Sequence, residues 1–344
     1  MENEKKSNKK KVLLIVGLSV LGLILALLVT GFIFGKTLLG YVGRLDDVEE
    51  TISQAEEEEI LNETDPVDPD ATEEVLEEEE EREEAELLEK SGNIINILLV
   101  GQDHRVEESA KRTRSDSMIL CTLNKAKKTL TLTSFMRDTW VKIPGKYYER
   151  LNVPYKVGGF KLLNATLESE FGVKVDYNVE VDFSGFEKII DALGGVEMTV
   201  TSGEAKHINK AAGTDIGEGT HILNGAQALG YARIRKLDND FKRTNRQRKV
   251  IASVFNSIKN QSLSDLYGIA KTVLPLIRTN MTDSEILNHI VEFAPMLSEI
   301  EIVSQRIPAD GAYIMTRIKG KSVLYMNNKN HKKNVELLKE TIGG

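Results

Sequence analysis

The sequence predicts an α/β protein: a three-layer α/β/α domain with a mixed central sheet, preceded by one N-terminal transmembrane helix. A long apolar run without a charge stands near the N-terminus. From residue 93 onward, strand-like and helix-like segments alternate without internal repeats, which is typical of one layered α/β domain. Residues 117–123 and 129–135 are strand-like runs joined by a short polar turn, and this hairpin pattern argues against a purely parallel sheet.

The apolar run covers residues 12–34 and favours a retained membrane anchor. At about 1.5 Å per residue, a helix of this length is about 34 Å long, enough to cross a hydrocarbon core of about 30 Å. A cleaved secretory signal is the alternative. Its apolar core would span roughly 7–15 residues and end at a small-residue cleavage site. The end of this run shows no Ala-x-Ala pattern, so we expect a transmembrane helix.

The flanking charges predict how this anchor is oriented. Five lysines precede the run, at positions 5, 6, 9, 10 and 11, whereas only Lys36 and Arg44 follow it closely. The positive-inside bias therefore places residues 1–11 in the cytoplasm as a basic tail and everything after the span outside. We expect a single-pass protein of the cell membrane with an extracellular C-terminal domain, and no nucleic acid among its partners.

Charge divides the rest of the chain into a linker over residues 35–92 and a basic domain over residues 93–344. Between residues 46 and 89, twenty-three acidic residues stand against Arg82 alone, so the net charge of −8 hides the basic character of the domain. Like charges at this density favour a solvated spacer. A calcium site is the alternative, but the spacing matches no EF-hand loop. Cys121 is the single cysteine, which excludes an intrachain disulfide and a cysteine-cluster metal site.

Periodicity and end signals predict the elements of the domain in order. An apolar run over residues 94–100 ends in Gly101 and predicts a buried strand. Two helical patterns are followed by Gly172 and Gly194, and we expect both helices to end there because glycine readily adopts the left-handed conformation that closes a helix. The other expected elements are strands at 117–123 and 129–135, helices at 159–171 and 184–193, a strand at 196–200, a helix at 241–259, two helices within 262–297, a strand at 300–307 and a helix at 328–341.

Arginine and aspartate gather at the ends of the expected strands. Asp103 follows the first strand, Arg114 and Asp116 precede the second, and Arg137 follows the third. Ligands commonly bind at strand ends in α/β sheets. Residues two apart on an extended chain point to the same side, so we expect Arg114 and Asp116 to face one site. Solvated turn residues are the alternative interpretation.

The second half of the domain repeats this pattern. Arg233 and Arg235 would lie about 200° apart on a helix. We therefore expect the preceding helix to end near Tyr231 and the two arginines to occupy extended chain. Arg243 and Gln247 are one helical turn apart at the start of a buried face, where a cation requires a polar partner. A bound anion and an internal carboxylate would satisfy this requirement equally well.

Together these side chains point to a phosphate-rich ligand and a divalent metal. The planar guanidinium of arginine matches phosphate oxygens. Asp103 and Asp116 are candidate ligands of Mg²⁺, which typically takes one or two protein carboxylates with waters and substrate phosphates. Arginines with a metal suit phosphoryl transfer, where catalysis is largely positioning and charge neutralisation.

These segments and their order resemble the LytR-CpsA-Psr family over roughly residues 93–260. Two departures from the family pattern are Met136, which stands where many members have proline, and the loop over residues 152–159. The resemblance is carried by Asn96-Ile-Leu-Leu-Val-Gly-Gln-Asp103-His-Arg105, Arg114-Ser-Asp116, Ser134-Phe-Met-Arg137-Asp138-Thr139, residues 186–196, Leu223-Asn-Gly-Ala-Gln-Ala-Leu, Tyr231-Ala-Arg233-Ile-Arg235 and Arg243-Thr-Asn-Arg-Gln247-Arg.

The resemblance implies a Mg²⁺-dependent cell-envelope transferase of Gram-positive bacteria. Such an enzyme moves a glycopolymer of the wall teichoic acid or capsular polysaccharide type from a polyprenyl-pyrophosphate carrier to a sugar hydroxyl of peptidoglycan, forming a phosphodiester. It also implies that Asp103 and Asp116 bind Mg²⁺ and act with Arg137 in catalysis. The residues expected to hold the pyrophosphate are Arg114, Arg137, Arg233, Arg235, Arg243 and Gln247, with Arg105 and Arg246 as second-rank candidates.

Two other functions remain open on the sequence. One is a non-catalytic surface module that binds a polyanionic polymer or lipid phosphate, and such binding would persist without Asp103 and Asp116. The other is a pyrophosphatase that cleaves the lipid-linked substrate without a sugar acceptor.

Overall fold

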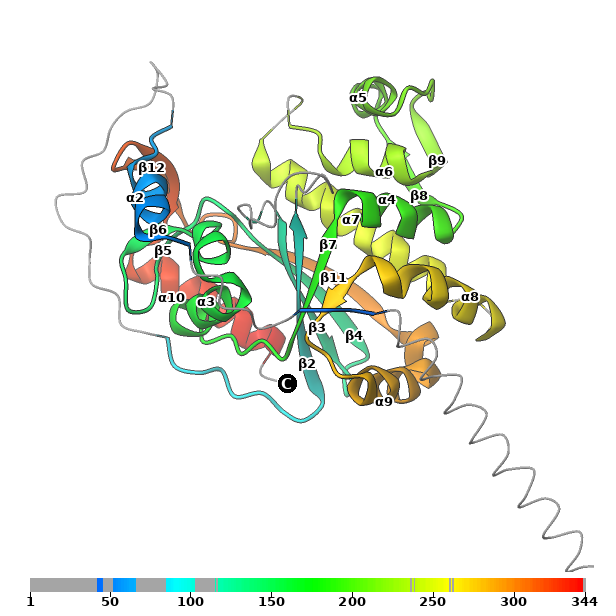
Figure 1. Cartoon of the computed structure of the whole chain (residues 1–344), viewed down its shortest axis with the longest axis horizontal. Coiled ribbons are helices and arrows are strands. Elements are labelled where there is room, and N and C mark those ends of the chain that lie inside the picture. Colours follow the sequence, from blue (N-terminus) through cyan, green and yellow to red (C-terminus); the bar gives the residue numbers. More distant parts are fainter. Residues whose placement is uncertain are drawn as a thin grey trace, which may run out of the picture.

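Helices cover both faces of a central sheet in the computed structural model (Figure 1). The structure describes residues 42–45, 52–65, 85–102, 115, 117–235, 237, 239–259, 261 and 263–342. The strands of the described residues are β1 (Gly43–Arg44), β2 (Ile94–Gln102), β3 (Ser117–Asn124), β4 (Thr129–Phe135), β5 (Trp140–Lys142), β6 (Tyr148–Arg150), β7 (Tyr177–Asp182), β8 (Val196–Val200), β9 (Gly219–Leu223), β10 (Arg278–Thr279), β11 (Glu301–Ile307), β12 (Ile314–Ile318) and β13 (Lys321–Tyr325). The helices are α2 (Gln54–Asn62), α3 (Val153–Phe171), α4 (Phe183–Ala192), α5 (Ser202–Ala212), α6 (Gly225–Ala232), α7 (Asp240–Lys259), α8 (Leu263–Val273), α9 (Asp283–Phe293) and α10 (Asn328–Ile342), with 3-10 turns η1 (Leu274–Leu276) and η2 (Ala294–Glu299).

The central sheet is mixed, as the sequence predicts. Its seven strands follow the order β1-β10-β7-β2-β3-β4-β11. β3 runs antiparallel to both β2 and β4, whereas β7 is parallel to β2 and β11 is parallel to β4. The antiparallel pairing of β3 with β4 confirms the hairpin expected over residues 117–135.

One end of this sheet collects the segments that carry the predicted site. Gly101 at the end of β2 pairs with Ser117 at the start of β3, and Met118 pairs with Phe135 at the end of β4. Because β3 runs opposite to its neighbours, its beginning lies beside their carboxyl ends. Ile307, at the end of β11, completes this edge by pairing with Phe135.

Strand residues alternate between two apolar cores, one on each face of the sheet. On one face Leu98 and Phe135 pack with Leu167 and Phe171 of α3, and α10 closes the same core. Successive strand side chains point to opposite faces. Ile119 therefore faces the other core, which is completed mainly by α7.

Helix α3 begins earlier than the expected 159–171 and is kinked. Pro154 lies in its first turn, where a missing amide hydrogen is tolerated. Gly158 and Gly159 interrupt the helical geometry, Gly159 with a positive φ of 59°. The helix ends at Gly172, whose φ of 68° confirms the predicted left-handed closure.

Parts of the segment predicted as a linker pack against the domain. Ile60 of α2 is 1% exposed and packs with Ile143, Val153 and Val157. Leu88 joins the core beneath α3, and its backbone N–H donates to the carbonyl of Gly172 at 2.9 Å. Figure 1 shows α2 beside β6 and β12, far in sequence from both.

The predicted membrane anchor lies outside the described residues. Within the described ranges, no helix is both long and apolar enough to cross a membrane. The basic tail, the expected span at residues 12–34 and most of the acidic run fall outside those ranges.

Candidate functional site

Arg137 lies in a tight turn at the carboxyl end of β4. The amide of Met136 donates to the carbonyl of Ile307 at 2.8 Å, which continues the pairing with β11. The hydroxyl and amide of Thr139 both donate to the carbonyl of Met136, at 2.7 and 3.2 Å. From the other side, the amide of Asn152 donates to the carbonyl of Arg137 at 3.1 Å. Hydrogen bonds made by Met136, Thr139 and Asn152 thus fix the backbone around Arg137.

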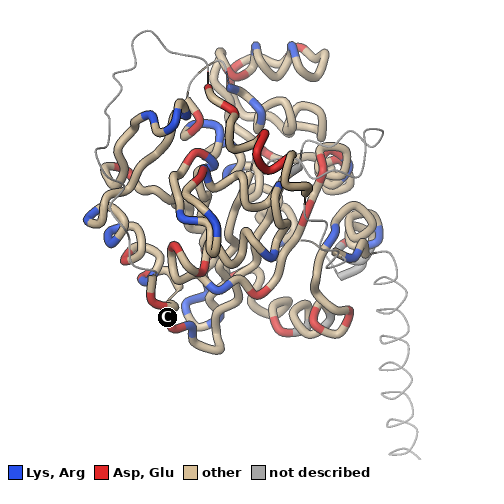
Figure 2. Tube along the Cα trace, turned by 60° about the vertical axis from the view of Figure 1, so that its left-hand side comes forward, with Lys and Arg blue, Asp and Glu red and all other residues tan. Residues whose placement is uncertain are grey.

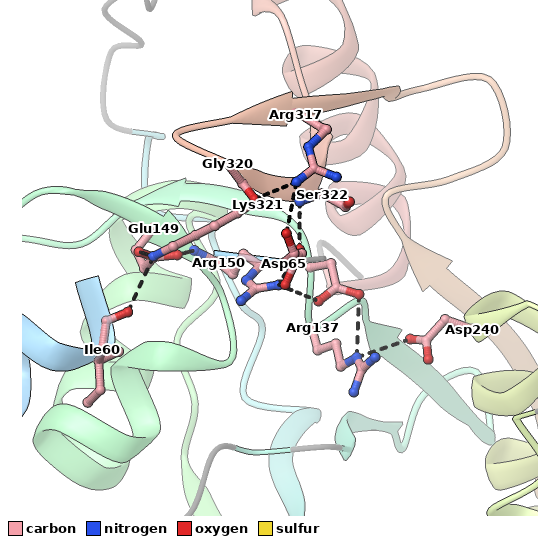
Figure 3. A network of polar contacts seen from close by, with 11 residues as sticks. Ile60, Asp65, Arg137, Glu149, Arg150, Asp240, Arg317, Gly320, Lys321 and Ser322 are labelled. Atoms are coloured by element: carbon pink, nitrogen blue, oxygen red, sulfur yellow. Dashed lines mark hydrogen bonds and ion pairs between the residues drawn. The ribbon is translucent and has the colours of Figure 1, made fainter. Parts of the chain in front are cut away.

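Two carboxylates flank the Arg137 side chain. Its Nε lies 3.4 Å from Oδ2 of Asp138 and 3.7 Å from Oδ2 of Asp240. Asp240 opens α7, and its other oxygen lies 2.6 Å from Nη1 of Arg243, which is 2% exposed. Figure 3 shows Arg137 directed toward Asp240. Asp240 therefore links two of the predicted phosphate-binding arginines across separate elements.

This local pairing fits the charge pattern of the whole domain. Figure 2 shows lysines and arginines interleaved with aspartates and glutamates along the described trace. Any local excess of positive charge in the described residues therefore comes from small groups of arginines rather than from one continuous basic face.

The Asp138 carboxyl is the group in this cluster whose ionisation is disfavoured. Burial raises the pKa of Asp138 above the usual aspartate value, and the negative charge of Asp240 acts in the same direction. Arg137 and Arg150 oppose this by lowering the pKa, without cancelling it. Asp138 therefore takes up a proton at a higher pH than an ordinary aspartate.

Helix α7 closes over the strand ends through short polar contacts. The hydroxyl of Ser117 donates to Oε1 of Gln247 at 3.2 Å. The hydroxyl of Thr244 donates to the sulfur of Met136 at 3.6 Å. Met136, the departure from the family pattern, is thus buried and contacts the helix that carries Arg243 and Gln247. Of the two partners that the sequence left open for Arg243, the structure provides the internal carboxylate.

The arginines at the end of α6 differ from the prediction. The helix ends at Ala232, close to the expected Tyr231, but Arg233 caps it with φ −99° and ψ 2°. The prediction of extended chain at Arg233 is therefore wrong, because its amide still donates to the carbonyls of the last helical turn. Arg233 is exposed and stacks on the ring of Phe183, with its guanidinium carbon 4.3 Å from the ring centroid. Arg235 is exposed as well.

Arg246 connects helix α7 to neighbouring elements of the domain. Its Nε donates to Oε1 of Glu204 at 2.8 Å, and Nη1 donates to the carbonyl of Ile234 at 3.3 Å. Burial alone would raise the pKa of Glu204, but hydrogen bonds from Arg246 and Thr201 outweigh it and lower the pKa. These bonds join α7 to α5 and to the segment after α6.

Arg248 is a buried cation that the sequence did not single out. It is 6% exposed, and the described residues give its Nε and Nη1 no hydrogen-bond acceptor. Its Nη2 makes one long contact, 3.5 Å from Oδ1 of Asn245. Burial and the charge of Arg306 lower the pKa of Arg248 to about 10. Neighbouring cations of this kind favour an anion close to the start of α7.

Four predicted residues lie outside the described part of the chain: Asp103, Arg105, Arg114 and Asp116. Their described sequence neighbours, Gln102 and Ser117, belong to strands that pair at the same end of the sheet as Arg137. Among the described residues, no three His, Cys, Asp or Glu side chains gather as a metal site. Asp138 and Asp240 are engaged by arginines. Of the predicted binding residues that the structure describes, Arg137 and Arg243 are joined through Asp240, and Gln247 lies one helical turn from Arg243 on α7.

The sequence interpretation missed Asp138 and Asp240 as members of this site. Asp240 stands three residues before Arg243, a spacing that puts both on one face of a helix. That spacing was a usable indication. The role of Asp138 was not visible in the sequence, because it depends on Arg150 and Asp240, which tertiary structure brings to it.

The chain is similar to known proteins over most of its length. The model of the LytR_cpsA_psr family matches residues 56–340, a range that includes α2. The chain is 32% identical over 253 residues to the regulatory protein MsrR of Staphylococcus aureus (strain Mu50), covering 72% of this chain and 75% of MsrR. It is 32% identical over 214 residues to the polyisoprenyl-teichoic acid–peptidoglycan teichoic acid transferase TagT of Bacillus subtilis (strain 168), covering 60% of this chain and 66% of TagT.

Two solved structures of TagT share the fold. One, bound to LIIa-WTA, has a TM-score of 0.61 and 28% identity, with 74% of this chain and 92% of that chain covered. The other, with bound octaprenyl pyrophosphate lipid, has a TM-score of 0.57 and 25% identity at the same coverage.

Proposed function

The chain belongs to the LytR-CpsA-Psr family, and we propose that it is a phosphotransferase acting on a polyprenyl-pyrophosphate-linked glycopolymer. The donor is a polymer of the wall teichoic acid or capsular polysaccharide type, and the acceptor is a sugar hydroxyl of peptidoglycan. The name of TagT and its complex with octaprenyl pyrophosphate support this substrate class. The proposal includes a single N-terminal membrane anchor at residues 12–34 and an extracellular domain, supported by the apolar run and its flanking lysines.

The observation that carries the proposal is the bridge that Asp240 makes between Arg137 and Arg243. It presents two guanidinium groups from different elements at the carboxyl end of β4. A pyrophosphate carries several negative charges, and arginine forks bind phosphate oxygens strongly. Arg233, Arg235, Gln247 and Arg114 complete the proposed binding set.

The reaction needs charge neutralisation and orientation more than covalent help from the protein. The acceptor hydroxyl attacks the phosphorus that carries the glycopolymer, and the bond from this phosphorus to the bridging oxygen breaks. The polyprenyl monophosphate leaves with that electron pair, and the hydroxyl proton passes to a carboxylate, for which Asp103 and Asp116 are the candidates. Arg137 and Arg243 stabilise the charge that develops on the leaving phosphate.

Mg²⁺ dependence is part of the proposal. Asp103 and Asp116 are the carboxylates proposed to hold the ion, and their oxygen chemistry suits it. Bound Mg²⁺ would offset phosphate charge at the site.

The test uses the full chain in detergent micelles, because α2 and Leu88 pack on the domain and a shorter fragment would lose them. The protein is incubated with a lipid-pyrophosphate-linked saccharide and peptidoglycan oligomers, with and without Mg²⁺, and products are identified by mass spectrometry. We expect a phosphodiester-linked product that Arg137→Ala reduces about a hundredfold or more. Lys125→Ala, which removes a cation paired with Glu292 at the opposite end of the sheet, should leave the rate unchanged.

Other outcomes separate the alternatives. Free saccharide phosphate without a peptidoglycan product would indicate a pyrophosphatase. Substrate bound but intact would indicate a binding module. Full activity in both Arg137→Ala and Asp116→Ala would contradict the proposed site.

A further inference from the structure

Asp65 lies in the segment predicted as a linker, three residues after the end of α2, and all its polar groups are engaged. Its amide donates to the carbonyl of Gly320 at 3.0 Å, and its carbonyl accepts from Nη2 of Arg317 at 3.0 Å. One carboxylate oxygen accepts the amide of Ser322 at 2.7 Å. Arg150 donates from Nη1 to both carboxylate oxygens at 3.1 Å. Such complete pairing is unusual for an aspartate in a solvated spacer.

The tip of the β12–β13 hairpin packs closely against Thr64 and Asp65. Lys319 and Gly320 form a two-residue turn with positive φ values of 51° and 74°. A Cβ on Gly320 would lie 2.8 Å from the methyl carbon of Thr64, so the close approach requires glycine. α2 ends at Asn62, its C-cap Glu63 is extended, and the proline that follows Asp65 disfavours helical geometry at Asp65 itself.

A line of alternating charges runs from Asp65 to the functional site (Figure 3). Arg150, 8% exposed, lies between Asp65 and Asp138, with Nη1 3.9 Å from Oδ1 of Asp138. The other oxygen of Asp138 contacts Arg137, which in turn faces Asp240. Neighbouring charges in this line have opposite sign, so a change at one alters the electrostatic interaction at the next.

The backbone reinforces the same connection. The amide of Leu324 in β13 donates to the carbonyl of Asp138 at 2.8 Å, and the amide of Leu151 donates to the carbonyl of Thr139 at 2.9 Å. The hairpin that binds Asp65 therefore also holds the turn that carries Arg137.

We infer that Asp65 is a positioning residue for the functional site: it anchors Arg150, which orients Asp138 and thereby Arg137. The inference deepens the proposed function and rests on it only for the contact between Arg137 and substrate phosphate. The acidic segment before the domain then contributes to the geometry of the site as well as to its distance from the anchor.

The arrangement predicts a shift in pH dependence with a definite sign. Asp138 is faced by Arg137, Arg150 and Asp240, and Asp65 is faced by Arg150, Arg317 and the Ser322 amide. In Asp65→Asn, Arg150 loses its competing carboxylate and pairs more closely with Asp138. The pKa of Asp138 then falls, so the acidic limb of the rate profile should move to lower pH.

The experiment compares Asp65→Asn with Glu57→Gln in the full chain in detergent micelles. Glu57 lies in α2, which precedes Asp65, and accepts from Lys146 and Tyr147 of the domain at 2.5 and 2.7 Å; among the contacts of the described residues it has none with Arg150. We expect kcat of Asp65→Asn to fall about ten- to a hundredfold with little change in KM, together with the shifted acidic limb. Asp65→Glu should restore part of the rate, whereas Glu57→Gln should keep the wild-type profile.

Hydrogen–deuterium exchange gives a readout that does not depend on activity. In Asp65→Asn, the amides of Leu151, Asn152 and Leu324 should exchange faster than in Glu57→Gln. Unchanged exchange at these amides would overturn the inference, whether or not the wild type transfers a polymer. Faster exchange together with an inactive wild type would contradict the proposed function and leave the positioning role of Asp65 standing. Should Asp65→Asn not fold, Arg317→Met, which removes the hydrogen bonds to the carbonyls of Asp65 and Gly320 but keeps the Asp65 carboxylate on Arg150, should give a smaller effect of the same sign. Wild-type exchange in Arg317→Met would then overturn the inference.

Discussion

Asp138 links the protonation state of the protein to the orientation of Arg137. Its pKa is raised by burial and by Asp240, so it gains a proton before an ordinary aspartate does. Asp65 behaves in the opposite way, because the Ser322 amide and Arg150 outweigh its burial and lower its pKa. On acidification, the Asp138 carboxylate is therefore neutralised before that of Asp65, which weakens its ion pair with Arg137 while Asp65 still holds Arg150.

This difference predicts an acidic limb in kcat/KM at a pH above the usual aspartate range. Asp138→Asn should lower activity near neutral pH and remove this limb. Because a raised pKa in the folded state means that protonation favours the fold, circular dichroism should show no unfolding across the same pH window. An unchanged limb in Asp138→Asn would assign the titration to another group.

At the scale of elements, Leu223-Asn-Gly-Ala-Gln-Ala-Leu builds the start of α6 rather than a binding surface. Asn224 and Gln227 form a reciprocal capping box. The amide of Gly225 donates to Oδ1 of Asp191 in α4 at 2.7 Å. A Cβ at Gly225 would lie 2.2 Å from the carbonyl oxygen of Glu187, so only glycine allows α6 to approach α4 this closely. The close packing fixes where α6 ends, and therefore where Arg233 begins its turn.

We expect Gly225→Ala to destabilise the protein by about 1–3 kcal/mol, since the clash is with rigid helix backbone. Gly268→Ala is the matched control: it lies in α8 with open space around the new Cβ, and should raise stability by about 0.5–1 kcal/mol. Urea denaturation of both variants measures the two effects. Equal stability of Gly225→Ala and wild type would show that α4 and α6 separate easily.

At the scale of the whole molecule, a buried ion pair joins three distant segments. Lys321 of β13 contacts Glu149 of β6, and these residues are 1% and 2% exposed. Lys321 also donates to the carbonyl of Ile60 at the end of α2, at 3.4 Å. The chain before the domain, the middle hairpin and the C-terminal hairpin therefore share one buried charge pair (Figure 3).

Lys321→Met should lower the free energy of unfolding by about 3–5 kcal/mol, because it leaves the Glu149 carboxylate buried without its cation. The double variant Lys321→Met with Glu149→Leu removes both charges and should recover most of this loss. Chemical denaturation of the wild type, the two single variants Lys321→Met and Glu149→Leu, and the double variant tests the pair as a double-mutant cycle. A loss in Lys321→Met below about 1 kcal/mol would mean that water reaches Glu149 in the variant.

Local pattern was sufficient for much of the fold. The strands β2, β3, β4, β8 and β11, the helix α7 and the two helices after residue 262 follow from apolar periodicity, and Gly172 closes α3 because glycine tolerates positive φ. The strands β5, β6, β7, β9, β12 and β13 and the helix α5 were not expected. The strands of the hairpins β5–β6 and β12–β13 are only three to five residues long and show no regular alternation of burial, so their sequences carry little strand signal and packing on the rest of the domain stabilises them.

The sequence by itself determined the class of fold, the acidic and basic division of the chain and the candidate arginines, because periodicity and charge are local properties. Only the tertiary structure decided that Asp240 joins Arg137 to Arg243, that Arg233 caps a helix, and that Asp65 reaches Arg150 from a segment expected to be a spacer. The physical reason is that each of these contacts joins elements whose separation along the chain carries no information about their separation in space. The interaction energy between charged side chains depends on how deeply they are buried and on which charges lie beside them, and tertiary packing creates both conditions.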